Sequence, residues 1–102
     1  MLHFRKDQWQ RNRWASIDIQ PVDDAYFPRL LAHLSNQYGF ALPSVTDIID
    51  GYAADFVLLG SKATLHIDTW TFSIAFEEER VRDRVLADLQ GLPPEYLEIR
   101  QR

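Results

Sequence analysis

The strongest constraint in this chain is an alternation of apolar and polar residues from Ala54 to Phe76, broken at Gly60-Ser61 and near Asp68-Thr69. Because successive side chains of a strand point to opposite faces, the pattern predicts three consecutive antiparallel strands. Gly followed by a small polar residue suits a two-residue hairpin turn, so we expect the first turn at Gly60-Ser61. We expect the second at Asp68-Thr69, with a wider turn as the alternative because β-branched Thr69 tolerates a positive φ poorly.

These turns set an expected register and two expected faces. Phe56 should pair with Leu65 across the first turn, and Leu65 with Phe72 across the second. The predicted buried face contains Ala54, Phe56, Leu58, Ala63, Leu65, Ile67, Trp70, Phe72 and Ile74. The predicted outer face, mostly polar, contains Asp55, Val57, Leu59, Lys62, Thr64, His66, Asp68, Thr71, Ser73 and Ala75. One face then belongs to a core and the other to a surface.

The flanking segments add one strand and two helices. Residues 14–20 alternate as a half-buried strand that ends before Pro21. A helix should follow, capped by Asp23 or Asp24, with its apolar stripe at Phe27, Leu30, Leu31, Leu34 and Tyr38. Gly39 supplies the left-handed residue that ends it. A second helix is expected over 77–90, with its buried stripe at Val81, Val85, Leu86 and Leu89.

Three segments are ambiguous. Residues 1–13 form a basic N-terminal arm, either a short strand or an arm packed over the body. Residues 40–53 are a connection that could contain one helical turn or a short strand. Residues 96–100 could add a last strand.

Together the elements predict one α+β domain over residues 1–102, folded as a two-layer sandwich. We expect a mainly antiparallel sheet of four or five strands with two helices on one face. The order is β-α-β-β-β-α with an optional final β, and a ferredoxin-like plan is compatible with it. The length suits a single modest core.

Composition excludes several classes of function. The chain has no cysteine, which removes disulfides, thiol catalysis and cysteine-based metal sites. It has no signal-like N-terminus and no apolar run long enough to span a membrane, so we expect a cytoplasmic protein without membrane contact. The glycines match neither a dinucleotide-binding nor a phosphate-loop motif, and we expect no cofactor.

The charge distribution suggests a further partner class. Residues 1–13 contain Arg5, Lys6, Arg11 and Arg13 against Asp7, a balance of +3, whereas the whole chain has −4. Basic residues interleaved with Trp9 and Trp14 could bind single-stranded nucleic acid. The acidic remainder would repel it, so nucleic acid is an unfavoured partner.

His66 and Asp68 are the candidate chemical pair, because they share one strand face. Thr64 or Ser73 could then act as a nucleophile in a small hydrolase, with Ser73 expected opposite Thr64. A metal site built on the same pair would need another carboxylate. No nucleophile elbow or oxyanion loop accompanies the pair, so we assign no catalytic and no metal-binding residue.

The preferred interpretation is a small, acidic, non-enzymatic protein-binding domain. It would act as a homodimer or on a dedicated partner, as antitoxins, immunity proteins and adaptors do. The expected contact residues are Val57, Leu59, His66 and Asp68, on the outer face of the sheet.

Overall fold

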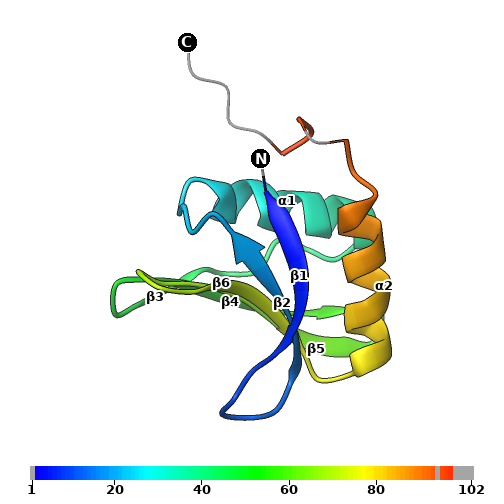
Figure 1. Ribbon diagram of the computed structural model, residues 1–102, viewed down its shortest axis with the longest axis horizontal. Helices are drawn as coiled ribbons and strands as arrows, with labels where there is room; N and C mark the ends of the chain where they lie inside the picture. The colour runs from blue at the N-terminus through cyan, green and yellow to red at the C-terminus, as the bar shows by residue number, and fades with distance from the viewer. Residues whose placement is uncertain (1, 94, 98–102) are drawn as a thin grey trace.

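The computed structural model describes residues 2–93 and 95–97, which form a six-stranded antiparallel sheet and two helices (Figure 1). The elements in chain order are β1 (His3–Gln8), β2 (Ala15–Gln20), α1 (Tyr26–Tyr38), β3 (Thr46–Ile48), β4 (Gly51–Leu58), β5 (Ser61–Ile67), β6 (Phe72–Phe76) and α2 (Glu79–Gln90). The strand order across the sheet is β1-β2-β6-β5-β4-β3. The α+β class is therefore as predicted.

The sheet has more strands than predicted, because two of the three ambiguous segments contribute one each. Residues 3–8 of the basic arm form β1, which pairs along its whole length with β2. The connection 40–53 contains β3, which pairs with the start of β4. The optional last strand is not formed where it can be judged: Tyr96 and Leu97 lie in a turn, and residues 98–100 lie outside the described part of the chain.

The topology also differs from the ferredoxin-like plan. The chain follows β-β-α-β-β-β-β-α, whereas that plan is β-α-β-β-α-β. α1 carries the chain from β2 to the opposite edge of the sheet, and β3 to β6 then return strand by strand until β6 lies beside β2. The return places the loops after β2, β3 and β5 at the same end of the sheet.

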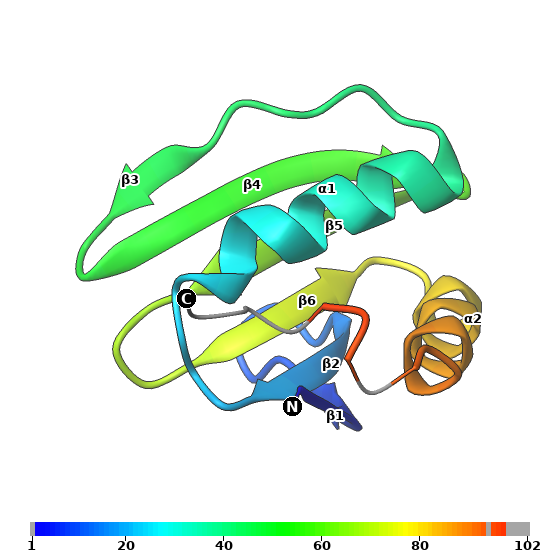
Figure 2. The ribbon, with the colours of Figure 1, turned by 90° about the horizontal axis from the view of Figure 1, so that it is seen from above.

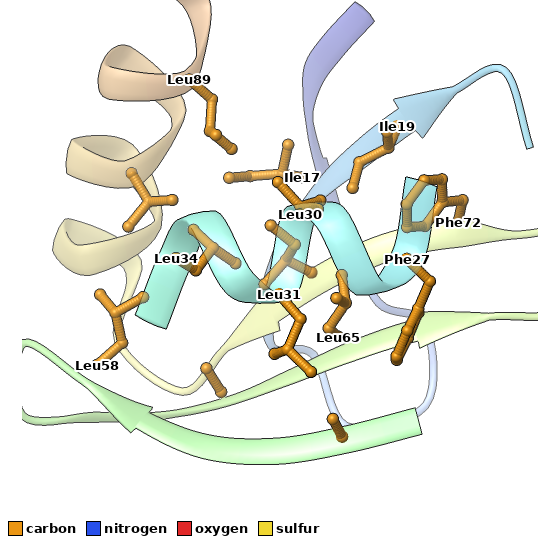
Figure 3. Close-up of a cluster of buried hydrophobic side chains, with 14 of the residues drawn as sticks. Ile17, Ile19, Phe27, Leu30, Leu31, Leu34, Leu58, Leu65, Phe72 and Leu89 are labelled. Carbon is orange, nitrogen blue, oxygen red and sulfur yellow. The ribbon is translucent and has the colours of Figure 1, made fainter. Parts of the chain in front are cut away.

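The two helices are arranged differently over the sheet, so the helix layout differs in detail from the two-layer prediction. α1 lies lengthwise over the sheet, whereas α2 is seen end-on in Figure 2 and packs against β1, β2 and β6. Both nevertheless contribute to one core. The side chains of Phe27, Leu30 and Leu34 point from α1 towards the strands (Figure 3), and Val81, Val85 and Leu89 from α2 belong to the same buried cluster.

The predicted register of the first hairpin is wrong by two residues. Phe56 pairs with Ala63 rather than Leu65, and the turn residues are Leu59 and Gly60. Both have a positive φ, 48° and 79°, which is the backbone of the turn type that best matches strand twist. The prediction missed this turn because leucine is a poor residue for positive φ. A shift of two preserves the faces, so Ala54, Phe56 and Leu58 are buried as expected.

The second turn is the wider one. Leu65 pairs with Ile74 rather than Phe72, and residues 68–71 form the loop, in which the Asp68 amide donates to the Thr71 carbonyl. Trp70 was predicted in the core, but it lies in this loop and is 86% exposed. The reason is that Asp68 accepts hydrogen bonds from the amides of Trp70 and Thr71, which fixes a four-residue turn.

Candidate functional site

The outer face of the sheet, opposite α1, is partly covered by the β1–β2 loop. Figure 1 shows this loop projecting on the side of the sheet away from α1. The Trp9 indole N–H donates to the Ser73 hydroxyl at 3.0 Å, and the indole ring meets His66 edge to face at 6.0 Å. Ser73 and Ala75 are buried, so this part of the predicted open face is closed.

His66 and Asp68 do meet on that face. The His66 Nε2 and Asp68 Oδ2 atoms are 2.9 Å apart, and both side chains are about three-quarters covered. The hydrogen bond from His66 is the main reason that the pKa of Asp68 lies below its ordinary value, and the amides of Trp70 and Thr71 add to it. The pair therefore holds the β5–β6 loop in place.

The two candidate nucleophiles of the hydrolase interpretation have hydrogen-bond partners other than His66. In the observed register Ser73 lies opposite His66, not Thr64. The Ser73 hydroxyl, however, accepts from Trp9, and the Thr64 hydroxyl donates to Asp55 at 2.6 Å. Within residues 2–93 and 95–97, no group of three or more histidine and carboxylate side chains is arranged to hold a metal ion.

An acidic cleft of about 800 Å³ opens at the end of the sheet where α1 begins. The β2–α1 loop, the β3–β4 hairpin and the β5–β6 loop form its walls. Figure 2 shows these three segments gathered at one end of the molecule. The residues that line the cleft include no lysine or arginine. They include five aspartates: Asp23, Asp24, Asp47, Asp50 and Asp68. Five carboxylates around one cleft give it a negative local potential.

Two exposed apolar residues lie on the turns that border the acidic cleft. Ile49, in the β3–β4 turn, is 90% exposed, and Trp70, in the β5–β6 loop, is 86% exposed. Their chain neighbours Asp50 and Thr69 line the cleft. We call the acidic cleft with Ile49 and Trp70 the acidic end. Large apolar side chains this exposed are typical of binding surfaces when they adjoin a concave site.

The four residues predicted as contacts do not form one surface. Asp68 lines the acidic cleft, and His66 contacts the Asp68 side chain. Val57 and Leu59 lie at the opposite end of the β4–β5 hairpin. Val57 is 58% exposed and borders a separate hollow of about 470 Å³ together with Trp14 and Lys62. The four predicted contact residues therefore lie at the two ends of the β4–β5 hairpin, and their contact with a partner stays a prediction.

The acidic end was missed because it is assembled from turns. Asp23 or Asp24 was expected to cap the helix, but the N-cap of α1 is Ala25, without a side-chain hydrogen bond, and Asp23 instead accepts from the Ala25 amide at 3.0 Å. A correct strand order would have revealed the cluster, since it places the loops after β2, β3 and β5 at one end of the sheet.

Comparisons with protein families, with curated proteins and with solved structures find no match to this chain. Neither helix in the described part of the chain is long and apolar enough to cross a membrane. The case for a function therefore depends on the geometry and charge of this domain alone.

Proposed function

We propose that this domain is a protein-binding module whose acidic end docks a basic partner protein. The observation that carries the proposal is the position of Ile49 and Trp70, nearly fully exposed on two hairpin turns that flank an aspartate-lined cleft. Tryptophan is strongly enriched among the residues that dominate binding energy at protein interfaces. Leaving it in water has no benefit for folding.

Charge defines the partner. Five carboxylates around one cleft would attract a surface rich in lysine and arginine and would accelerate its association. Two copies of the chain facing each other through this end would instead bring like charges together. The same charges disfavour homodimerisation through this end and favour a dedicated partner, as in the antitoxin, immunity or adaptor roles.

The test begins with capture of partners from the source cells, followed by reconstitution of the pure binary complex. A double substitution, Ile49→Ser with Trp70→Ser, should weaken that complex by at least about a hundredfold, the equivalent of two tenfold steps of 1.4 kcal/mol each. The matched control is Val57→Ser with Leu59→Ser, which removes two exposed apolar side chains at the other end of β4 and β5. The control should bind within about threefold of the wild type.

Three results would count against the proposal. Loss of binding in the control but not in the double variant would return the interface to Val57 and Leu59. A captured partner that is acidic at its contact surface would remove the electrostatic argument. A concentration-dependent dimer in sedimentation, abolished by the double variant, would make the chain its own partner.

A further inference from the structure

The two edge strands of the sheet, β1 and β3, differ in how their outward backbone groups are covered. An edge strand leaves every second peptide unit facing away from its neighbour, where another strand can pair with it. At the β1 edge, α2 supplies a partner: the Gln90 side-chain amide donates to the Phe4 carbonyl at 3.1 Å. Arg5 and Lys6 add charge to this strand. The β1 edge is thus protected by a helix and by basic side chains.

The β3 edge has apolar side chains in place of such protection. Figure 2 shows β3 outermost in the sheet, reached by a segment that runs back alongside β4 from the end of α1. Along this edge Leu42 is 64% exposed, Val45 47% and Ile49 90%. Thr46 and Asp47 are exposed as well. Exposed apolar side chains along an open strand edge are the features that strand addition requires.

Charge decides what can add to this edge. A second copy of β3 pairing antiparallel about its centre would place Asp47 opposite Asp47 of the other copy, and like charges directly opposite are destabilising. Asp47 also lines the acidic cleft with Asp50, so the repulsion would not be limited to one pair. A strand with lysine or arginine opposite Asp47 would instead be attracted to it.

We propose that the β3 edge receives an extended, basic segment of the partner protein as a seventh strand. This inference rests on the proposed function, since it describes how the partner engages the acidic end. The added strand pairs with the outward peptide units of residues 45–47. Because side chains alternate between the two faces of a strand, its basic side chains lie on the face of Asp47 and its apolar side chains lie on the other face, with Ile48.

A synthetic probe tests the pairing directly. The probe is a labelled peptide of about ten residues in which lysine and valine alternate, the length and pattern of one strand. It should bind at low salt and shift the amide NMR signals of residues 45–49 more than those of β1. The matched control peptide has the same sequence with alternate backbone nitrogens methylated, which removes the donors of one edge and keeps the charge. Its affinity should fall about tenfold, the loss of one to two hydrogen bonds.

Two protein variants test the charge. Asp47→Lys should weaken the lysine–valine peptide about tenfold, whereas Asp55→Lys, the same charge change on the outer face of β4, should leave it within about threefold. Equal binding of the methylated and unmethylated peptides would overturn the proposal, because attraction alone would then explain binding. Larger shifts in β1 than in residues 45–49, or equal effects of the two substitutions, would overturn it as well.

The partner complex separates this inference from the function on which it rests. Val45→Pro removes an amide donor just outside the β3–β4 ladder. If Ile49→Ser with Trp70→Ser abolishes the complex but a folded Val45→Pro variant binds normally, the proposed function stands and strand addition is wrong. If the double variant binds normally, the proposed function itself fails. Should Val45→Pro not fold, the methylated peptide gives the same decision.

Discussion

Asp68 connects three groups at the acidic end through one carboxylate. Its Oδ2 contacts His66, and its Oδ1 accepts from the amides of Trp70 at 2.8 Å and Thr71 at 2.7 Å. Asp68→Ala should therefore lower the free energy of unfolding by about 1–2 kcal/mol at neutral pH, comparable to the loss of a helix cap. Urea denaturation of the variant and the wild type measures the difference. A loss below about 0.3 kcal/mol would show that the loop keeps its shape without the carboxylate.

The same residue predicts a pH dependence. The folded state lowers the pKa of Asp68 below its ordinary value of 3.8, so folding favours the charged carboxylate. The stabilisation is fully present above the unfolded-state pKa and is lost as the pH falls through the folded-state pKa. The stability difference between wild type and Asp68→Ala should hence be constant above about pH 5 and shrink in stronger acid. A difference that grows on acidification would contradict this assignment.

Arg82 is a buried cation, with 2% of its surface exposed. It donates to the backbone carbonyls of Asp7 and Ser16 and pairs with Asp83 and Glu79. Arg82→Met keeps most of the stem but leaves both carbonyls without that donor, so we expect a loss of about 2–3 kcal/mol. Arg80→Met is the control, because Arg80 is exposed and its pair with Glu78 contributes little. Thermal and urea unfolding of both variants test the prediction, and equal losses would contradict it.

For single residues, the sequence predicts a contact only where the two residues are close together in the chain. His66 and Asp68 lie two residues apart on one strand, and the sequence identified them as a pair. Arg82 occupies a helix position next to Asp83, where a charged residue is normally interpreted as solvent-exposed. Its burial depends on the packing of α2 against β1 and β2, which no local pattern encodes.

At the scale of elements, two turn glycines differ in what they require. A Cβ on Gly51 would lie 1.8 Å from the Ile67 carbonyl oxygen, whereas a Cβ on Gly60 would meet nothing within 4 Å but would have to accept a φ of +79°. Gly60→Ala should cost about 1 kcal/mol, the strain of a left-handed backbone. Gly51→Ala should cost more, roughly 2–4 kcal/mol, because β4 must move away from β5. Denaturation midpoints of the two variants give the order, and the reverse order would contradict the close approach.

Element types and faces were predictable, whereas the register was not. Both hairpins are shifted by two residues from the expected pairing, and a shift of two leaves every side chain on the same face. The hydrophobic pattern therefore could not distinguish the alternatives. The decision depended on turn chemistry: Leu59 accepts a positive φ in one turn, and Asp68 caps the other.

At the scale of the molecule, the sequence predicted the core and left the edges open, with a short strand as one alternative both at residues 1–13 and at residues 40–53. The apolar stripes of α1, α2 and the central strands are long and periodic, and most of those residues are buried. β1 and β3 lack such a stripe, since an edge strand has little buried surface to create one. The sequence did not predict the acidic end either, because β3 forms one wall of its cleft.

The basic arm belongs to the fold, and this changes how its function can be tested. Residues 3–8 form β1, with Leu2 and Phe4 packed against the core and α2 bound to the strand backbone. Deleting residues 1–13 should expose the edge of β2 and abolish a cooperative thermal transition, because the domain has a single core. A deletion variant that unfolds cooperatively near the wild-type temperature would contradict this role.

Nucleic-acid binding should instead be tested by charge. Replacing Lys6, Arg11 and Arg13 by serine removes three exposed cations from β1 and its loop and should change the unfolding temperature by only a few degrees. If the arm contacts single-stranded nucleic acid, the triple variant should bind a labelled oligonucleotide more weakly and with a smaller salt dependence. We expect weak binding of the wild-type chain and no effect of the triple variant on the partner complex, because the acidic end is formed by other loops. A partner complex lost with these three cations would move the docking surface to the opposite end of β2.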